Sequence, residues 1–467
     1  MTRLDGRKRS RAPKRLVSVL VVLAATGLGL SLFRAGSAPE ITVASGVPGI
    51  GRDTELAVRL DAGGRGLGDV KVELVQGERR TVLAEHSYTA RPPWAFWGER
   101  DASVTLPVQV GSAALGDRLE EGTATLRVEA RPPGAWLRKG DPALVEREFE
   151  VLLRPPALGV LSIQHYPAQG GAEVVVYSVG RTSVRDGVES GGTWYPGFAL
   201  PGSPAGQRFA LFGVPFDLES KEEIRLVAED AVGNRAERAF VDRLQPKAYE
   251  RDRIEVSAQF LAKVVPEIVS NSLSVREADT QLETYISINR DLRARNTAEL
   301  TRLASESRRE FLWSESFTGL PGSQVMSAFA DRRTYLFEGR QIDQQDHLGF
   351  DLASVKRTPV PAANRGVVVL ARYFGIYGNA VVLDHGFGLM SLYGHLSTLE
   401  VEAGQTVERG QSLGRTGQTG LAGGDHLHFT MLLQGQAVNP VEWWDASWIR
   451  NRVRSKLGPA FPVGDQQ

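Results

Sequence analysis

The strongest constraint on the fold is a series of short runs, starting near residue 39, in which apolar and polar residues alternate. Successive side chains of a β-strand point to opposite faces of a sheet, so each run predicts a half-buried strand. Clusters of Gly, Pro and Asp separate the runs. The first such strands are expected at ELAVRLDA (55–62), DVKVELVQ (69–76), ASVTLPVQV (102–110), TATLRVEAR (123–131) and REFEVLLR (147–154). The chain is therefore expected to be mainly β.

These runs predict two β modules of immunoglobulin-like type, the first an antiparallel sandwich over residues 37–155 and the second over 156–246. The second module contains the runs 171–180 and 207–216, and a hairpin in AEDAVGNRAERAFV with Gly-Asn at its turn. We expect both modules to act in spacing or packing rather than in catalysis. An adhesin or glycan-binding protein led by these modules is an alternative.

Residues 247–316 are predicted to form a helical linker or lid. From 247 to 310 the sequence changes to a helical register, and VREADTQLETYISINRDLRARNTAELTRLASES (275–307) has few helix breakers. Pro266 and the SNSLS stretch are expected to divide the region into at least two helices. The sequence leaves open whether these helices form a stalk or a lid on the domain that follows.

The N-terminal residues 1–36 are predicted to form a cytoplasmic basic tail and a membrane anchor. Residues 1–15 are strongly basic, and LVSVLVVLAATGLGLSLF (16–33) carries no charge and is long enough to span a bilayer. Because the basic flank is expected to stay in the cytoplasm, everything after Arg34 would lie in the periplasm or outside the cell. A cleaved signal peptide is the rival interpretation, and a buried core helix is less favoured.

Composition narrows the classes of function. The chain has 467 residues, enough for two to four domains. Basic and acidic residues number 55 each, whereas a nucleic-acid-binding protein usually has a basic excess, so no nucleic-acid partner is expected. There is no cysteine, so a metal would be held by histidine, carboxylate or other oxygen ligands.

Histidines cluster near the C-terminus. Five of the seven lie between residues 347 and 428. His426 and His428 are two residues apart in HLHF, so on a strand both imidazoles would project from one face. Such a pair suits a divalent metal, or one ligand beside an acid–base group.

A second motif, HLGFD, supplies His347 and Asp351. Gly349 and the strand-like surroundings favour a loop leading into a strand over a helix. His347, Asp351 and one histidine of the 426/428 pair would complete a zinc site with three protein ligands, leaving the fourth position for water. His395, in YGHLS, is either a structural histidine or part of the same site. We expect His385 to be mainly structural.

HLGFD (347–351), YGHLS (393–397) and HLHF (426–429) together resemble the lysostaphin/LytM-type zinc metallopeptidases, which are cell-wall endopeptidases. The resemblance extends to VEAGQTVERGQSLG (401–414) and covers residues 321–445. This chain departs from the usual pattern at Gly423-Gly424-Asp425, where relatives often have Thr-Gly-Pro, and at Phe429-Thr430, where they often have Phe-Glu. The role of Asp425 is left open.

The resemblance implies a C-terminal two-layer antiparallel β peptidase domain, placed at residues 317–450 and followed by a tail at 451–467. It implies one Zn²⁺ per chain held by His347, Asp351 and His428. His395 and His426 would flank the water and the scissile carbonyl, one as general base and the other stabilising the oxyanion.

The resulting hypothesis is a hydrolase anchored in the bacterial inner membrane by a single pass. It would be a zinc metalloendopeptidase acting on peptidoglycan cross-links or stem peptides in the cell wall, with possible cell-wall or division proteins as partners. The alternative is a non-catalytic scaffold or activator of cell-wall hydrolases with the same fold. Such relatives typically lose zinc ligands, and this chain keeps the full set.

Overall fold

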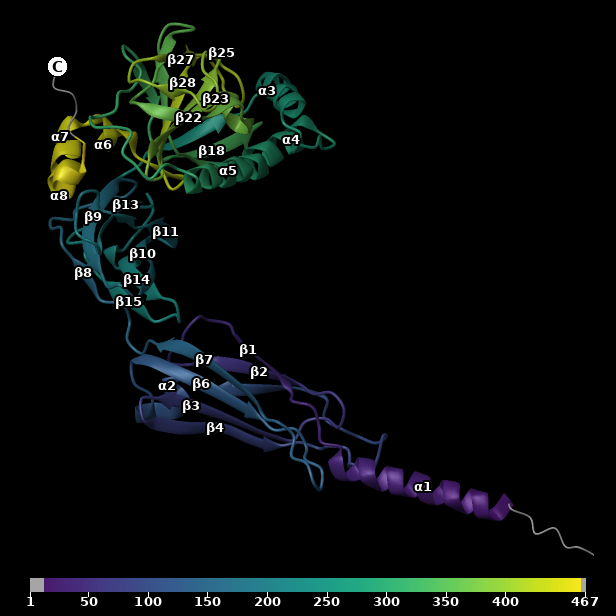
Figure 1. Ribbon diagram of the computed structural model, residues 1–467. Coiled ribbons are helices and arrows are strands. Elements are labelled where there is room, and N and C mark those ends of the chain that lie inside the picture. The colour runs from purple at the N-terminus through teal and green to yellow at the C-terminus, as the bar shows by residue number, and fades with distance from the viewer. Residues whose placement is uncertain (1–11, 463–467) are drawn as a thin grey trace, which may run out of the picture. The chain divides into compact units, whose positions relative to one another are not determined.

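The computed structural model describes residues 12–462 (Figure 1). Within this range one helix, α1 (Ala12–Phe33), is long and apolar enough to cross a membrane. A secretory signal would satisfy the same criterion, so the anchor stays a prediction. Residues 1–11 of the predicted basic tail and 463–467 of the predicted C-terminal tail lie outside the described residues.

The described residues form two compact units. One holds the chain up to Pro155 together with Glu229–Arg235, and the other holds the remainder. Most of their regular structure is antiparallel sheet, so the prediction of a mainly β chain with a helical segment is confirmed.

The first unit contains two antiparallel sheets that share one apolar core. Alternation explains the sheets: β3 buries Val70, Val72 and Leu74 and turns the residues between them outward. The five strands predicted here match β2, β3, β5, β6 and β7. The elements are β1 (Glu40–Ser45), β2 (Glu55–Asp61) and β5 (Ser103–Gln109) in one sheet, β4 (Arg79–Ser87), β3 (Asp69–Gln76), β6 (Gly122–Ala130) and β7 (Ala143–Val151) in the other, with α2 (Ser112–Leu115) and η1 (Gly116–Arg118).

Two further four-stranded sheets follow along the chain, and apart from residues 229–230 and 235 their strands belong to the second unit. Their strands are β11 (Thr193–Pro196), β10 (Ser183–Ser190), β14 (Ile224–Asp230) and β15 (Arg235–Arg238) in one, and β12 (Phe198–Ala199), β13 (Gln207–Gly213), β9 (Ala172–Val179) and β8 (Leu158–Val160) in the other; η2 (Lys221–Glu223) precedes β14. That these sheets and those of the first unit are immunoglobulin-like stays a prediction.

The C-terminal β domain is built on a large sheet whose central strands carry the histidine motifs. Its order is β17 (Gln324–Ser327), β20 (Phe350–Ala353), β28 (Leu427–Leu433), β24 (Leu389–Leu396), β23 (Asn379–Gly386), β22 (Gly366–Tyr373) and β26 (Thr406–Val407), with β29 (Gln436–Val438) beside β28. A small sheet holds β21 (Pro359–Pro361), β27 (Ser412–Arg415) and β25 (Thr398–Leu399), and η4 (Gly375–Tyr377) connects β22 to β23.

A third sheet joins this domain to the segment before it. β16 (Arg251–Glu255) pairs in parallel with β18 (Asp331–Phe337), which pairs with β19 (Arg340–His347). The predicted helical register from residue 247 is therefore wrong at its start. Ile254 is the single large apolar residue of β16, so the strand lacks the apolar alternation that reveals the others.

The helical segment consists of α3 (Ala258–Asn271) and one continuous helix formed by α4 (Gln281–Ser287), the π-helical turn η3 (Ile288–Leu292) and α5 (Arg293–Ser305). A capping box between Thr280 and Glu283 starts α4. The predicted division into at least two helices is confirmed at the SNSLS stretch, since α3 ends at Asn271 and α4 begins at Gln281. The prediction is wrong for Pro266, which lies inside α3 between buried residues that pack against the protein.

These helices pack against the C-terminal domain. Leu261, Val264 and Ile268 of α3 share a core with Tyr335 and Ile376, and α5 packs on the opposite side of the segment against the large sheet. That these helices act as a lid stays a prediction. The chain closes with α6 (Pro440–Trp444), α7 (Ala446–Trp448), η5 (Ile449–Arg454), α8 (Ser455–Leu457) and η6 (Gly458–Ala460), so much of the predicted tail is helical.

Candidate active site

Three neighbouring strands deliver the three predicted ligands. His347 ends β19, Asp351 lies in β20, and His428 lies in β28, directly opposite Asp351 in the β20–β28 pairing. HLGFD is thus a loop leading into a strand, as predicted. Gly349 leaves the space that the site needs, because a Cβ there would lie 2.5 Å from Nε2 of His428.

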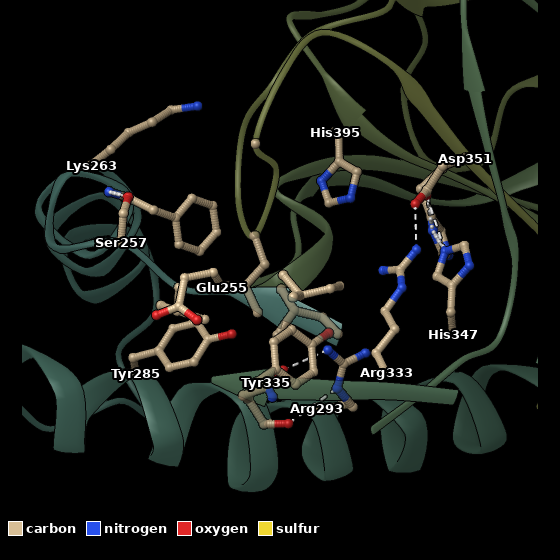
Figure 2. A pocket seen from close by; sticks show the side chains of 18 of the residues that line it. Glu255, Ser257, Lys263, Tyr285, Arg293, Arg333, Tyr335, His347, Asp351 and His395 are labelled. Carbon is tan, nitrogen blue, oxygen red and sulfur yellow. Dashed lines mark hydrogen bonds and ion pairs between the residues drawn. The ribbon is translucent and has the colours of Figure 1, made fainter. Parts of the chain in front are cut away.

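The ligand atoms converge on one point. His347 Nε2 and His428 Nδ1 each lie 3.1 Å from Asp351 Oδ1, and the two nitrogens lie 3.1 Å from each other. His347, Asp351 and His428 form a group of the size that could hold a metal ion. Figure 2 shows His347 and Asp351 side by side at one end of the cavity.

Backbone and hydroxyl partners fix the tautomers of both histidines. His347 Nδ1 donates to the carbonyl of Ala328 at 3.0 Å. The Thr430 hydroxyl donates to the carbonyl of Leu348, so it accepts from His428 Nε2 at 2.9 Å. In the neutral rings, His347 Nε2 and His428 Nδ1 therefore carry lone pairs and no proton.

This donor set fits a divalent cation. Two imidazole nitrogens and a carboxylate oxygen face one another without a proton between them, and zinc binds this combination of ligands. Burial lowers the pKa of His428 to about 4, so that ring stays neutral. Burial raises the pKa of Asp351, but the histidines around it outweigh that effect and hold the pKa well below its ordinary range.

Arg333 completes the support of the carboxylate. From β18 its guanidinium donates to Asp351 Oδ2 at 2.8 Å, leaving Oδ1 toward the histidines (Figure 2). This contact was not among the sequence-based predictions. Thr430, noted only as a departure from the usual pattern, proves to be the partner that orients His428.

The two predicted catalytic histidines face the same site. His395 Nδ1 donates to the carbonyl of Thr419 at 2.8 Å, and His426 Nδ1 donates to that of Gly424 at 2.9 Å. Each ring therefore presents Nε2 toward the cavity, and the ring centroids lie 4.8 Å apart. The prediction that His426 and His428 share a face is confirmed, because both lie within 3.4 Å of Asp351 Oδ1.

The electrostatic surroundings of these two rings differ. Burial lowers the pKa of His395 well below its ordinary value, with further lowering by His426 and His428. Burial also lowers the pKa of His426, but its interaction with Asp351 outweighs that effect and the pKa is raised. His395 has φ of 62°, a left-handed conformation that a non-glycine residue adopts at a cost in free energy.

The histidines line one side of a cavity of about 860 Å³ whose other side is formed by the helical segment. Figure 2 shows Lys263, Tyr285 and Arg293 across the cavity from His395. Two α3 side chains tie the helix to the loop before His426: Lys263 Nζ donates to the carbonyl of Ala422 at 3.1 Å, and Glu267 accepts from the Gly420 backbone at 2.8 Å.

Two other residues lie apart from the site. His385 is fully buried, with Nδ1 donating to the carbonyl of Arg365 and Nε2 at 2.7 Å from the Ser391 hydroxyl, as expected of a structural histidine. Asp425 accepts from the Thr416 hydroxyl at 2.6 Å and from a backbone amide. It holds its loop in place and has no hydrogen bond with His426.

Comparison with known proteins identifies the domain. A family model described as Peptidase family M23 matches residues 345–440. The chain is 43% identical over 96 residues to the peptidoglycan DD-endopeptidase ShyA of Vibrio cholerae, covering 21% of this chain and 22% of that protein. It is 42% identical over 95 residues to the DD-carboxypeptidase/endopeptidase Mpg of Neisseria meningitidis, covering 20% and 22%.

A third relative has a different kind of name. The murein hydrolase activator EnvC of Escherichia coli is 40% identical over 95 residues, covering 20% of this chain and 23% of that protein. These alignments span less than a quarter of the length of each relative. The predicted resemblance is thus confirmed for the C-terminal domain.

Proposed function

Because its residues 345–440 belong to Peptidase family M23, we propose that this protein is a zinc metalloendopeptidase that hydrolyses peptide bonds in peptidoglycan cross-links or stem peptides. The relatives named for peptidoglycan endopeptidase activity support this substrate. We also propose that α1 is an uncleaved inner-membrane anchor, which would place the domain in the periplasm or outside the cell.

The observation that carries the proposal is that the N–H groups of both ligand histidines point away from the place where the metal would bind. His347 and His428 give their N–H groups to Ala328 and Thr430, so their lone pairs meet beside Asp351. These three residues would hold the metal. Zinc bound there would supply Lewis-acid chemistry to the scissile carbonyl and to water.

His395 and His426 would transfer the protons. Each has its Nδ1–H on a backbone carbonyl, so Nε2 accepts a proton when the ring is neutral and donates one when it is charged. One ring would take the proton of the attacking water, and the other would donate to the developing oxyanion. The α3 wall of the cavity would position the peptide between them.

A non-catalytic activator of cell-wall hydrolases is the second candidate, favoured by the similarity to a murein hydrolase activator. The retained ligand set and the two further histidines support the enzyme instead. Digestion of purified peptidoglycan by the zinc-loaded full chain, followed by mass spectrometry of the muropeptides, separates the two. We expect new cleavage products that a His395→Ala variant does not form. Intact peptidoglycan, together with stimulation of an added amidase, would establish the activator.

A further inference from the structure

Two loops of the first unit share a short sequence pattern. RPPWAFW (91–97) follows β4, RPPGAWL (131–137) follows β6, and both read Arg-Pro-Pro, any residue, Ala, an aromatic and a large apolar residue. Their large side chains are turned to solvent, with exposed fractions of 65% for Trp94, 70% for Trp97 and 78% for Trp136. Phe96 and Leu137 are similarly exposed.

This concentration is unusual within the part of the chain that the structure describes. Of its tryptophans, only Trp94, Trp97 and Trp136 are more than half exposed. The surface of a soluble protein rarely carries such a cluster of exposed apolar side chains unless the cluster is a binding site. Tryptophan also has a polar N–H on a large apolar ring, which suits it to the boundary between hydrocarbon and water.

Both loops are fastened to the end of α1. The buried side chain of Arg65 donates to the carbonyl of Arg91 in the first loop at 2.7 Å, to that of Gly134 in the second at 2.6 Å, and to that of Arg34 after the helix at 3.0 Å. One guanidinium therefore holds the two loops and the helix exit together.

Direct bonds reinforce this arrangement. The Leu137 amide donates to the carbonyl of Leu32 in the last turn of α1 at 2.9 Å, and the Arg34 side chain donates to the carbonyl of Ala95 at 2.7 Å. The guanidinium of Arg34 also lies 3.9 Å from the ring centroid of Phe96. The loops thus sit at the level of Leu32–Arg34.

The length of α1 sets the depth of that level. Its 18-residue apolar stretch, Leu16–Phe33, is not buried by protein, and at about 1.5 Å per residue it extends roughly 27 Å. The hydrocarbon core of a bilayer is about 30 Å thick. When α1 spans a membrane, Phe33 lies at the outer edge of the hydrocarbon, and the loops bonded to its neighbours lie at the headgroup boundary.

We propose that these two loops insert Trp94, Phe96, Trp97, Trp136 and Leu137 into the outer boundary of the bilayer that α1 spans. The exposed Arg138 and Lys139, directly after the second loop, then face the lipid phosphates. The first β unit would be held against the membrane surface by these side chains as well as by the helix. This inference rests on the proposed function in one respect, that α1 stays in the membrane.

The test uses the full chain in phosphatidylcholine vesicles that contain brominated lipids, which quench tryptophan on contact. We expect bromines placed near the headgroup to quench the fluorescence more strongly than bromines deep in the acyl chains. A variant carrying Trp94→Ser, Trp97→Ser and Trp136→Ser is expected to lose this quenching. The matched control Trp448→Phe, which changes a partly buried tryptophan, is expected to keep it.

Flotation after alkaline carbonate treatment reports on the anchor separately. Protein that floats with the vesicles but shows no quenching, or equal quenching in the triple variant, overturns the loop insertion and leaves the anchor intact. Loss of the protein from the vesicles overturns the anchor itself, and the insertion with it. The depth profile of the unaltered chain needs no substitution, so misfolding of the triple variant does not weaken the test. Specific crosslinking of position 136 to a protein in cell membranes, without quenching by lipid, would assign the patch to a protein partner.

Discussion

The two carboxylate oxygens of Asp351 have different partners. Oδ2 accepts a hydrogen bond from the Arg333 guanidinium at 2.8 Å, and Oδ1 lies 3.1 Å from His347 Nε2. The arginine fixes the direction in which Oδ1 points. We expect Arg333→Met, which keeps an unbranched apolar stem but removes the guanidinium, to weaken zinc binding about 10- to 100-fold. Competition with a chelator measures this affinity. Arg332→Met is the matched control, since Arg332 pairs with Asp346 at the surface. Equal affinities in the two variants would refute the assigned role.

His428→Ala removes one of the three ligand atoms and its support from Thr430. We expect the purified variant to contain little zinc, because two remaining ligands hold the metal poorly. Elemental analysis gives the metal content per chain. His86→Ala, at an exposed position in β4, is expected to retain a full equivalent. Undiminished zinc in the His428 variant would sink the ligand assignment.

His395→Ala separates catalysis from metal binding. The ring lies beside His426 and packs edge-on against His428, but His395 is not one of the three proposed ligands and its Nδ1–H bonds to the Thr419 backbone, so the metal is expected to stay. We expect the rate of muropeptide release to fall about 10²- to 10⁴-fold, the range typical of losing one proton-transfer group. Full activity on purified cell wall would count against a catalytic role.

The link between α3 and the loop before His426 can be loosened at Lys263. Its Nζ donates to Ala422 and Gln418, so Lys263→Met removes two bonds without removing the helix. We expect a faster rate on intact cell wall, by up to about tenfold, because widening the cavity favours bulky substrates. The rate on small soluble muropeptides should change little. Ser270→Ala on the same helix serves as control, and a uniform change on both substrates would argue against the lid.

We expect Glu442 to make the stability of the second unit depend on pH. Its carboxyl group accepts from the Ala172 amide, and burial raises its pKa from 4.5 to about 8. Between these values the folded chain binds a proton that the unfolded chain has released, so stability falls as the pH rises. The full effect is at most about 5 kcal/mol.

Glu442→Gln removes that titration. We expect the melting temperature of wild type to fall more between pH 5.5 and pH 8.5 than that of the variant, because the amide stays neutral throughout. Calorimetry of the two proteins side by side gives the comparison. Parallel pH profiles would show that Glu442 does not titrate in this range.

Residue spacing predicted the parts of the site that are close in the chain, and the resemblance joined His347 and Asp351 to the distant His428. The spacing of His426 and His428 was enough to place both rings on one face, since strand geometry is fixed over two residues. The contact between Arg333 and Asp351 could not be predicted from the sequence, because it depends on how the strands β18, β19 and β20 are aligned with one another. Thr430 was visible only as a departure from a pattern.

The fold shows the same division. The alternation of apolar and polar residues predicted the bounds of β3 correctly, because Val70, Val72 and Leu74 face a core. The parallel strand β16 was not predicted, because its partner β18 lies far along the chain and because the outward residues of β16 are charged. Pairing over such distances is decided by packing, not by the local pattern.

Phe209 of the second β module and Phe387 of the C-terminal domain pack with ring centroids 5.0 Å apart, inside one continuous core. The family model matches residues 345–440, a smaller segment than the apolar core that contains these two rings. A chain that carried residues 345–440 alone would lack Phe198, Phe209 and Phe311, the aromatic rings that pack against Phe387. A chain reduced to residues 345–440 would therefore expose Phe387 to water unless that ring were replaced by a polar residue.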